Sequence, residues 1–232
     1  MARSVLLLCS AAAGLLVLAS ARTEPASQPL PGWSDTFTAR LTALALLQTL
    51  NAELLSHDSA TLTLDRWCAA HQMASPAKVV ADPLPVIDKP ATAVQRLELA
   101  VSPSEPVRYR HVQLRCGEHV LSVAENWYVP SRLTSDMNRL LQTTNISFGR
   151  VVQPLHFWRH VLAAQWLWSP LPIGWERGGP REWAPWPGMQ SGVLRHRAVL
   201  VLPDGRPLSE VIETYTAEVL AFAEPQEPGA TR

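Results

Sequence analysis

An arginine and a glutamate, distant in the sequence, each fall on the apolar face of a predicted β-strand. Arg110 lies in RYRHVQLRC (108–116) and Glu213 lies in VIETY (211–215). Successive strand residues point to opposite faces, so each charge shares its face with apolar neighbours. Charged groups are seldom buried without a partner, because desolvation costs several kcal/mol per ion. We therefore expect Arg110 and Glu213 to contact each other, as an internal ion pair, or a bound ligand.

The two residue types suit the chemistry of small carboxylates. The planar guanidinium of an arginine can hold a carboxylate through two parallel hydrogen bonds. A carboxyl group held among apolar side chains can act as a general acid when a bond to oxygen breaks. The pair therefore indicates a site for a small anionic molecule, with or without catalysis.

The surrounding pattern predicts an α+β domain, with an antiparallel sheet of five or six strands flanked by helices. Gly117 and Asp204–Gly205 mark two hairpin turns. Residues 209–222 could form a helix by propensity alone, but the Asp-Gly turn and the β-branched residues favour a strand. Predicted helices cover 36–56, 64–73 and 133–143, and predicted strands cover 108–116, 119–129, 151–168, 195–203 and 206–215.

Residues 1–21 have the pattern of a secretory signal peptide. Arg3 supplies the positive charge, an apolar core follows, and Ala19-Ser20-Ala21 forms a small-residue cleavage site. The alternative is an uncleaved anchor, although the apolar core is shorter than the roughly 20 residues that a span needs. We expect export, to the periplasm or outside a bacterial cell, with no stable membrane span after cleavage.

The remaining chain divides into three parts. Residues 22–34 are predicted to be a flexible lead, 35–224 the folded domain, and 225–232 a disordered tail. Residues 169–192 are rich in Trp, Pro and Gly and are predicted to form a long loop or lid. With 20 basic and 20 acidic residues, the chain has no net formal charge and no basic patch, so we expect no nucleic-acid partner. We expect a monomer.

Export would leave two cysteines, Cys68 and Cys116. An oxidising compartment permits a disulfide between them, and two buried free thiols are the alternative. Neither has metal-ligand spacing. His156 and His160 would share a helix face, but on a strand they would be about 13 Å apart, too far to bind one ion. We predict no metal site.

Short motifs in a fixed order resemble those of the chorismate lyase family. They are R-x-V-x-L from Arg110, GEHVL from Gly117, SFGR from Ser147, HFWRHVL from His156, GRPL from Gly205, and E-T-Y from Glu213. The resemblance runs from Tyr109 to Phe222, about half of the chain. Each motif is short, and it is their shared order that makes them specific.

This resemblance implies a chorismate lyase-like antiparallel sheet with a ligand pocket closed by flaps. Chorismate lyases eliminate pyruvate from chorismate to give 4-hydroxybenzoate, without a metal or organic cofactor. The family's substrate-binding arginine falls on Arg110 and its catalytic glutamate on Glu213. The residue whose backbone N–H contacts the ligand falls on Phe148, followed by Gly149. Small gaps near Arg110 leave Arg108 or Arg115 as alternatives.

Three hypotheses follow. The first is a carbon–oxygen lyase acting on chorismate or a similar enolpyruvyl compound. The second is a non-catalytic exported protein that binds small aromatic carboxylates on the same fold, by analogy with ligand-binding modules of transcription regulators. The third is an envelope protein that uses residues 169–192 against a partner. The six tryptophans between 158 and 186 either line an aromatic ligand site or fill a core.

Overall fold

The structure is a computed structural model that describes residues 28–85, 88–178 and 182–226. The predicted signal peptide, 1–21, lies outside the described residues. So do residues 22–27 of the predicted lead and residues 227–232 of the predicted tail.

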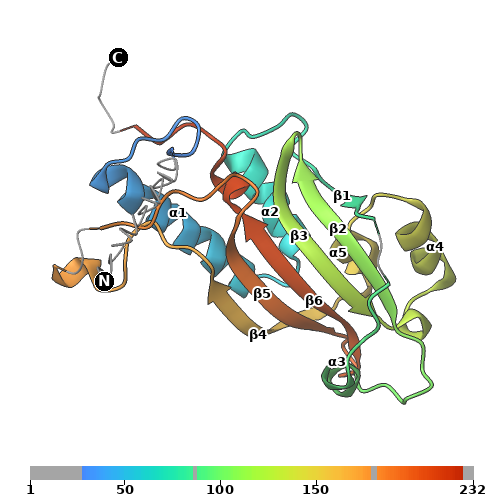
Figure 1. Ribbon diagram of the computed structural model, residues 1–232. Helices are drawn as coiled ribbons and strands as arrows, with labels where there is room; N and C mark the ends of the chain where they lie inside the picture. The colour runs from blue at the N-terminus through green and yellow to red at the C-terminus, as the bar shows by residue number, and fades with distance from the viewer. Residues whose placement is uncertain (1–27, 86–87, 179–181, 227–232) are drawn as a thin grey trace, which may run out of the picture.

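Six antiparallel strands form one sheet in the order β1-β2-β3-β6-β5-β4 (Figure 1). This confirms the predicted α+β class. The strands are β1 (Val79–Pro83), β2 (Arg108–Cys116), β3 (His119–Tyr128), β4 (Trp158–Trp166), β5 (Gly192–Val201) and β6 (Pro207–Thr216).

Two hairpins form the centre of the sheet. Gly117 and Gly205 turn them with positive φ angles of 58° and 85°, which glycine adopts without steric cost. β3 then pairs with β6, so that Ala124 of the first hairpin lies opposite Glu213 of the second. Only β3 separates the strand of Arg110 from the strand of Glu213.

In the described ranges five α-helices flank the sheet (Figure 1), and α1, α2, α4 and α5 pack on its inner face. In chain order they are α1 (Phe37–Ser56), α2 (Ala60–Ala70), α3 (Ala93–Glu98), α4 (Ser135–Thr143) and α5 (Phe148–Val152). α2 begins earlier than predicted because Ser59 caps it, accepting a hydrogen bond from the Leu62 N–H.

The strand predicted over 151–168 is shorter than expected. Residues 148–152 form α5 and residues 153–155 form a 3₁₀ turn with Pro154 in its first positions. Proline fixes φ near −65° and lacks an N–H, which suits the start of such a turn. β4 therefore begins only at Trp158.

The inner face of the sheet contributes to two separate hydrophobic clusters. The first packs α1 and α2 against residues such as Val112, Leu114 and Tyr215. The second packs α4 and α5 against Tyr128, Leu200 and Leu208. A smaller cluster on the opposite face includes Leu99 and Trp127. Arg110 and Glu213 lie on the inner face, as the alternation predicted.

Part of the predicted flexible lead is in the core, which corrects the boundary at residue 34. Leu30 is 3% exposed and Trp33 is 6% exposed. The Trp33 indole N–H donates to the carbonyl oxygens of Leu220 and Phe222, 3.0 Å from each. Proline and serine content suggested flexibility, but two large apolar side chains are enough to anchor the segment.

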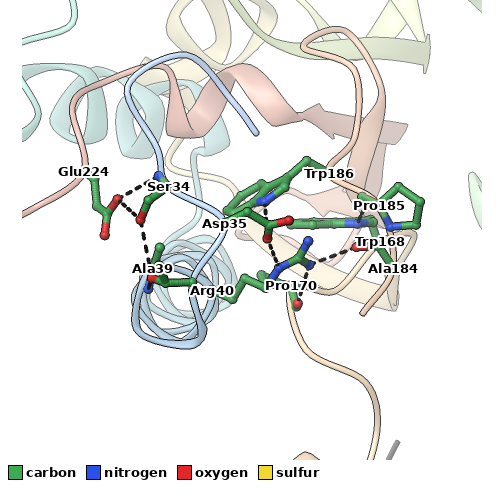
Figure 2. Close-up of polar contacts among 11 residues, drawn as sticks. Ser34, Asp35, Ala39, Arg40, Trp168, Pro170, Ala184, Pro185, Trp186 and Glu224 are labelled. Atoms are coloured by element: carbon green, nitrogen blue, oxygen red, sulfur yellow. Dashed lines mark hydrogen bonds and ion pairs between the residues drawn. The ribbon is translucent and has the colours of Figure 1, made fainter. Parts of the chain in front are cut away.

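Residues 169–192 are here called the Trp–Pro segment. In its described parts, 169–178 and 182–192, it contains one 3₁₀ turn and the first residue of β5 and otherwise no helix or strand. Arg40 holds the segment against α1 (Figure 2). The Arg40 side chain is 2% exposed. Its Nε donates to Asp35 Oδ1 at 2.6 Å, and its Nη1 donates to the carbonyl oxygens of Pro170 and Ala184 at 2.9 Å each. One side chain thus ties two points of the segment to the helix.

Tryptophans of the Trp–Pro segment complete this contact. The Arg40 guanidinium lies 4.9 Å from the ring centre of Trp183 and 5.0 Å from that of Trp186, within cation–π range. Trp186 also donates its indole N–H to Asp35 Oδ1 at 3.0 Å (Figure 2). These tryptophans therefore stabilise the fold of the segment.

A disulfide joins Cys68 of α2 to Cys116 at the end of β2. Both residues are fully buried. The bond ties the helix that covers the inner face to the strand that carries Arg110. Within the described part of the chain, no helix combines the length and apolar character needed to cross a bilayer.

Candidate functional site

A cavity lies on the inner face of the sheet, between the two larger hydrophobic clusters. Its floor is formed by β2, β3 and β6, and its roof by the segment before α2 together with the start of α5. The cavity volume is about 40 Å³. Four residues singled out from the sequence line it: Arg110, Phe148, Gly149 and Glu213. Their roles in binding or catalysis stay predictions.

Arg110 has few partners for a half-buried cation. Its Nη2 donates to the carbonyl oxygen of Ile146 at 3.1 Å. Within the described chain, no carboxylate forms a salt bridge with it. Burial lowers the pKa of the Arg110 guanidinium, and the nearby Tyr128 raises it. Of the two alternatives, Arg108 is exposed and Arg115 pairs with Asp82 at 2.8 Å, and neither lines the cavity.

Glu213 pairs with Arg159 rather than with Arg110. Arg159 Nη2 lies 2.6 Å from Glu213 Oε2, and both side chains are almost fully buried, at 2% and 8% exposed. The Tyr215 hydroxyl donates to the same oxygen at 3.1 Å. The direct Arg110–Glu213 ion pair that the sequence allowed is therefore wrong, although both residues face one cavity.

The sequence reasoning missed Arg159, although a signal was present. Arg159 lies in the apolar run HFWRHVL, as Arg110 lies among apolar residues of its own strand. It reaches Glu213 from β4, across β5, and its Nη1 also donates to the Leu54 carbonyl oxygen at 3.2 Å. The charge of Arg159 on an apolar strand face could have identified it as a buried residue. Its partner, Glu213, could not be identified, because that depends on the order of the strands in the sheet.

The charges of Arg159 and Glu213 shift the pKa values of each other's neighbours in the core. Burial alone would lower the pKa of Arg159, but the charge of Glu213 raises it. Burial, with the charge of Glu213, holds the pKa of the Tyr215 hydroxyl well above its usual value. Burial and then the charge of Arg159 lower the pKa of His196 to about 4. His196 therefore stays neutral near pH 7, with Nε2 bound to Asn51 Oδ1 at 2.8 Å.

Asn126 is a cavity residue that the sequence did not reveal. It lies opposite Arg110 in the β2–β3 register and is 5% exposed. Among the described residues, neither its side-chain Nδ2 nor its Oδ1 has a hydrogen-bond partner. An asparagine in a strand carries no sequence signal of this state, because it depends on what the neighbouring side chains bind.

The roof of the cavity is a close contact between two chain segments. A Cβ added at Gly149 would lie 2.9 Å from Ser59 Oγ, closer than carbon and oxygen normally approach. Glycine therefore lets the start of α5 meet the residue that caps α2. Ser147, the N-cap of α5, makes no side-chain hydrogen bond to the helix. Arg150 of α5 pairs with Asp65 of α2 at 2.6 Å, which joins the two elements of the roof.

Other sequence candidates lie away from this cavity. Within the described ranges, the Trp–Pro segment contributes no residue to its lining, so the segment is not a lid for it. His156 occupies a left-handed turn before β4 and His160 lies within that strand, so they share no helix face. No group of three metal-ligand residues occurs in the part of the chain that was searched.

Fold and site together define an α+β protein with an arginine-lined cavity on the inner face of an antiparallel sheet. No family model matches the sequence. The chain is 53% identical over 201 residues to the uncharacterized protein y4mC of Sinorhizobium fredii, covering 83% of each chain. It therefore belongs to the same family as y4mC.

Solved structures of bacterial proteins are similar to part of this chain. PhnF of Mycobacterium smegmatis matches with a TM-score of 0.46 and 13% identity, over 75% of this chain and 70% of that one. A GntR-family transcriptional regulator of Enterococcus faecalis matches with a TM-score of 0.39 and 11% identity, over 64% of this chain and 99% of that one. YydK of Bacillus subtilis matches with a TM-score of 0.39 and 14% identity over 64% of this chain, and the match spans only 62% of YydK. These likenesses assign no ligand and no activity to this chain.

Proposed function

We propose that this protein binds a small aromatic or enolpyruvyl carboxylate in the Arg110 cavity. The observation that carries this proposal is the state of Arg110: a half-buried guanidinium that lines a cavity and donates to one neutral carbonyl oxygen. A buried cation without an anion is costly, and a carboxylate is the group whose geometry matches a guanidinium. A carboxylate ligand would supply the missing countercharge.

The aromatic part of such a ligand has a matching surface. Phe148 and Phe157 line the cavity together with aliphatic residues of the sheet. Aromatic side chains favour offset or edge contacts with other rings. At about 40 Å³ the cavity holds only a few water molecules, whereas ligand sites usually measure several hundred Å³. Binding of an aromatic acid therefore requires the roof to move.

The test is a ligand-induced shift in thermal stability. Saturating 4-hydroxybenzoate should raise the melting temperature, since a ligand at about 100 times its Kd adds roughly 2.7 kcal/mol to the free energy of unfolding. Arg110→Gln should remove the shift. Arg115→Gln is the matched control, because Arg115 pairs with Asp82 outside the cavity, and it should keep the shift. No shift with 4-hydroxybenzoate or chorismate would contradict the proposal.

A second candidate function is a carbon–oxygen lyase, favoured by the presence of Glu213 in the same cavity. Elimination of pyruvate from chorismate breaks the ether C–O bond, removes the proton from the neighbouring ring carbon and protonates the enolpyruvyl group. Both hydrogen bonds to Glu213 converge on Oε2, which leaves Oε1 for a substrate. To donate a proton, however, Glu213 would have to act while bound to Arg159, and this is why binding without turnover ranks first.

Turnover has a direct assay. The lyase hypothesis expects release of 4-hydroxybenzoate and pyruvate in equal amounts from chorismate, and loss of both in Glu213→Gln. Tyr215→Phe, which removes one hydrogen bond from the same carboxylate, should reduce the rate without abolishing it. If chorismate stabilises the protein but yields no product, the lyase hypothesis fails and the binding proposal stands.

Export to the periplasm or outside the cell is part of the same proposal. It is supported by the signal-peptide pattern of residues 1–21 and by the buried Cys68–Cys116 disulfide, because such bonds persist in oxidising compartments. The mature protein should begin at Arg22. A cytoplasmic protein that retains residues 1–21 would contradict it. A monomeric state stays a prediction.

A further inference from the structure

Asn126 is the least satisfied polar group in the cavity. It is 5% exposed, yet its amide neither donates nor accepts a hydrogen bond within the described chain. A buried amide left without partners costs about 1–3 kcal/mol. The cost falls at a position that lines the cavity, so a bound molecule could offset it.

Asn126 also lies beside the group that would hold a carboxylate. Its cross-strand partner is Arg110, and the Cβ atoms of directly opposed residues are about 5 Å apart. A ligand carboxylate on the guanidinium would therefore come within reach of the amide. The Nδ2 group can donate to that carboxylate, but Oδ1 can only accept, so it requires a donor on the ligand itself.

The charges of the cavity favour a ligand with one negative charge, and they therefore count against chorismate, which carries two carboxylates. Two arginines and one glutamate line its interior, Arg110, Arg159 and Glu213, and this set leaves one positive charge. Asp58 lines it too, but it is exposed and lies at the rim. One carboxylate neutralises the interior. A second would be buried without a countercharge, which is strongly unfavourable.

We infer that the ligand is a small 2-hydroxy monocarboxylate with an apolar, aromatic tail. In such an acid the hydroxyl group and the nearer carboxylate oxygen lie side by side, as the C=O and N–H of the Asn126 amide do. The hydroxyl group donates to Oδ1, Nδ2 donates to the carboxylate, and Arg110 holds the carboxylate from the other strand. This inference rests on the proposed binding function of the cavity and names its ligand class.

Phenylacetate and two derivatives substituted at carbon 2 test it by isothermal titration calorimetry on the purified protein. Phenylacetate lacks a substituent on carbon 2, mandelate carries a hydroxyl group there, and phenylmalonate carries a second carboxylate. One enantiomer of mandelate should bind at least about tenfold more tightly than phenylacetate. This ratio corresponds to about 1.4 kcal/mol of binding free energy, which phenylacetate loses because it cannot make the hydrogen bond from the hydroxyl group. Phenylmalonate should bind at least about tenfold more weakly than that enantiomer.

Variants at residue 126 assign the preference to the amide. Asn126→Leu should abolish the advantage of mandelate while phenylacetate keeps its affinity within about threefold. Asn126→Asp, of nearly the same shape, should weaken both acids by repulsion. Ser122→Ala is the control: Ser122 is a buried residue of the same strand face that does not line the cavity, and all affinities should persist.

The outcomes separate the two proposals. Equal affinities for mandelate and phenylacetate, or a mandelate advantage that survives in Asn126→Leu, would overturn the hydroxy-acid inference. So would binding of 4-hydroxybenzoate with none of the three acids, although the binding function would then stand. If neither 4-hydroxybenzoate nor any of the three acids binds, the binding function fails and the inference fails with it.

Discussion

Arg40 and Arg110 are both drawn into the protein, but their surroundings differ. Arg40 bonds Asp35 and two backbone carbonyl oxygens (Figure 2). Its guanidinium also lies against the rings of Trp183 and Trp186. Arg110 donates to one carbonyl oxygen and otherwise faces a cavity. The hydrogen bond from Arg40, opposed by burial and assisted by Trp186, holds the pKa of Asp35 below its usual value. Arg110 has no such carboxylate among the described residues.

The difference separates an arginine that stabilises the fold from one that is available to a ligand. Five guanidinium N–H groups are available on each side chain. Where the protein itself occupies most of them, as for Arg40, the side chain joins two chain segments. Where it leaves most of them unoccupied inside a cavity, as for Arg110, removal of the charge should affect binding more than folding. The predictions below test this contrast in order of expected effect on stability.

The largest effect is expected for Arg40→Met. The substitution leaves two backbone carbonyl oxygens without their donor, at about 1–3 kcal/mol for each one that stays buried, whereas Asp35 is exposed and can be solvated. Urea unfolding monitored by tryptophan fluorescence measures it. Arg139→Met is the control, because the Arg139–Asp136 pair is exposed and should contribute under about 1 kcal/mol. A loss below about 1 kcal/mol for Arg40→Met would show that the Trp–Pro segment is held by other contacts.

Glu213→Gln should come next, with a loss of about 3 kcal/mol, because the variant leaves the buried Arg159 without its anion. Tyr215→Phe removes a single hydrogen bond to the same oxygen and should cost about 1 kcal/mol. Chemical denaturation of both variants measures the two losses in the free energy of unfolding. Equal losses would mean that Arg159 is not the main partner of Glu213.

His196 should make the protein sensitive to acid. Its pKa is depressed to about 4 in the folded state, below the usual 6.5, so the unfolded chain binds a proton first as the pH falls. The stability present above pH 6.5 should therefore decline down to about pH 4, by up to about 3 kcal/mol. His196→Gln should flatten the pH dependence across this window, measured by denaturant unfolding. An unchanged slope in the variant would contradict the assignment.

Much of this fold could be predicted from the sequence. The alternation in 108–116 and 206–215 placed Arg110 and Glu213 on the inner face, because a strand leaves only two choices for each side chain. The glycines of two turns fixed the hairpins. The motif order that resembles chorismate lyase singled out Phe148 and Gly149, and both line the cavity.

The rest depended on how strands and loops are arranged in space. Strand order decides that Arg159 reaches Glu213 across β5, and no local pattern encodes this order. The unpartnered state of Asn126 depends on the bonds its neighbours make. The composition of residues 22–34 favoured flexibility, whereas the burial of Leu30 and Trp33 depends on the distant residues they pack against.

The most direct test of the contrast is the free energy of unfolding of Arg110→Met, measured with and without saturating 4-hydroxybenzoate. Without ligand the variant should be as stable as the wild type within about 0.5 kcal/mol, or more stable, because a poorly paired buried charge is replaced by an apolar chain of similar length. With ligand only the wild type should gain stability. A variant that loses 2 kcal/mol or more without ligand, or that is stabilised by the ligand as much as the wild type, would contradict the assignment of Arg110 as the carboxylate-binding residue.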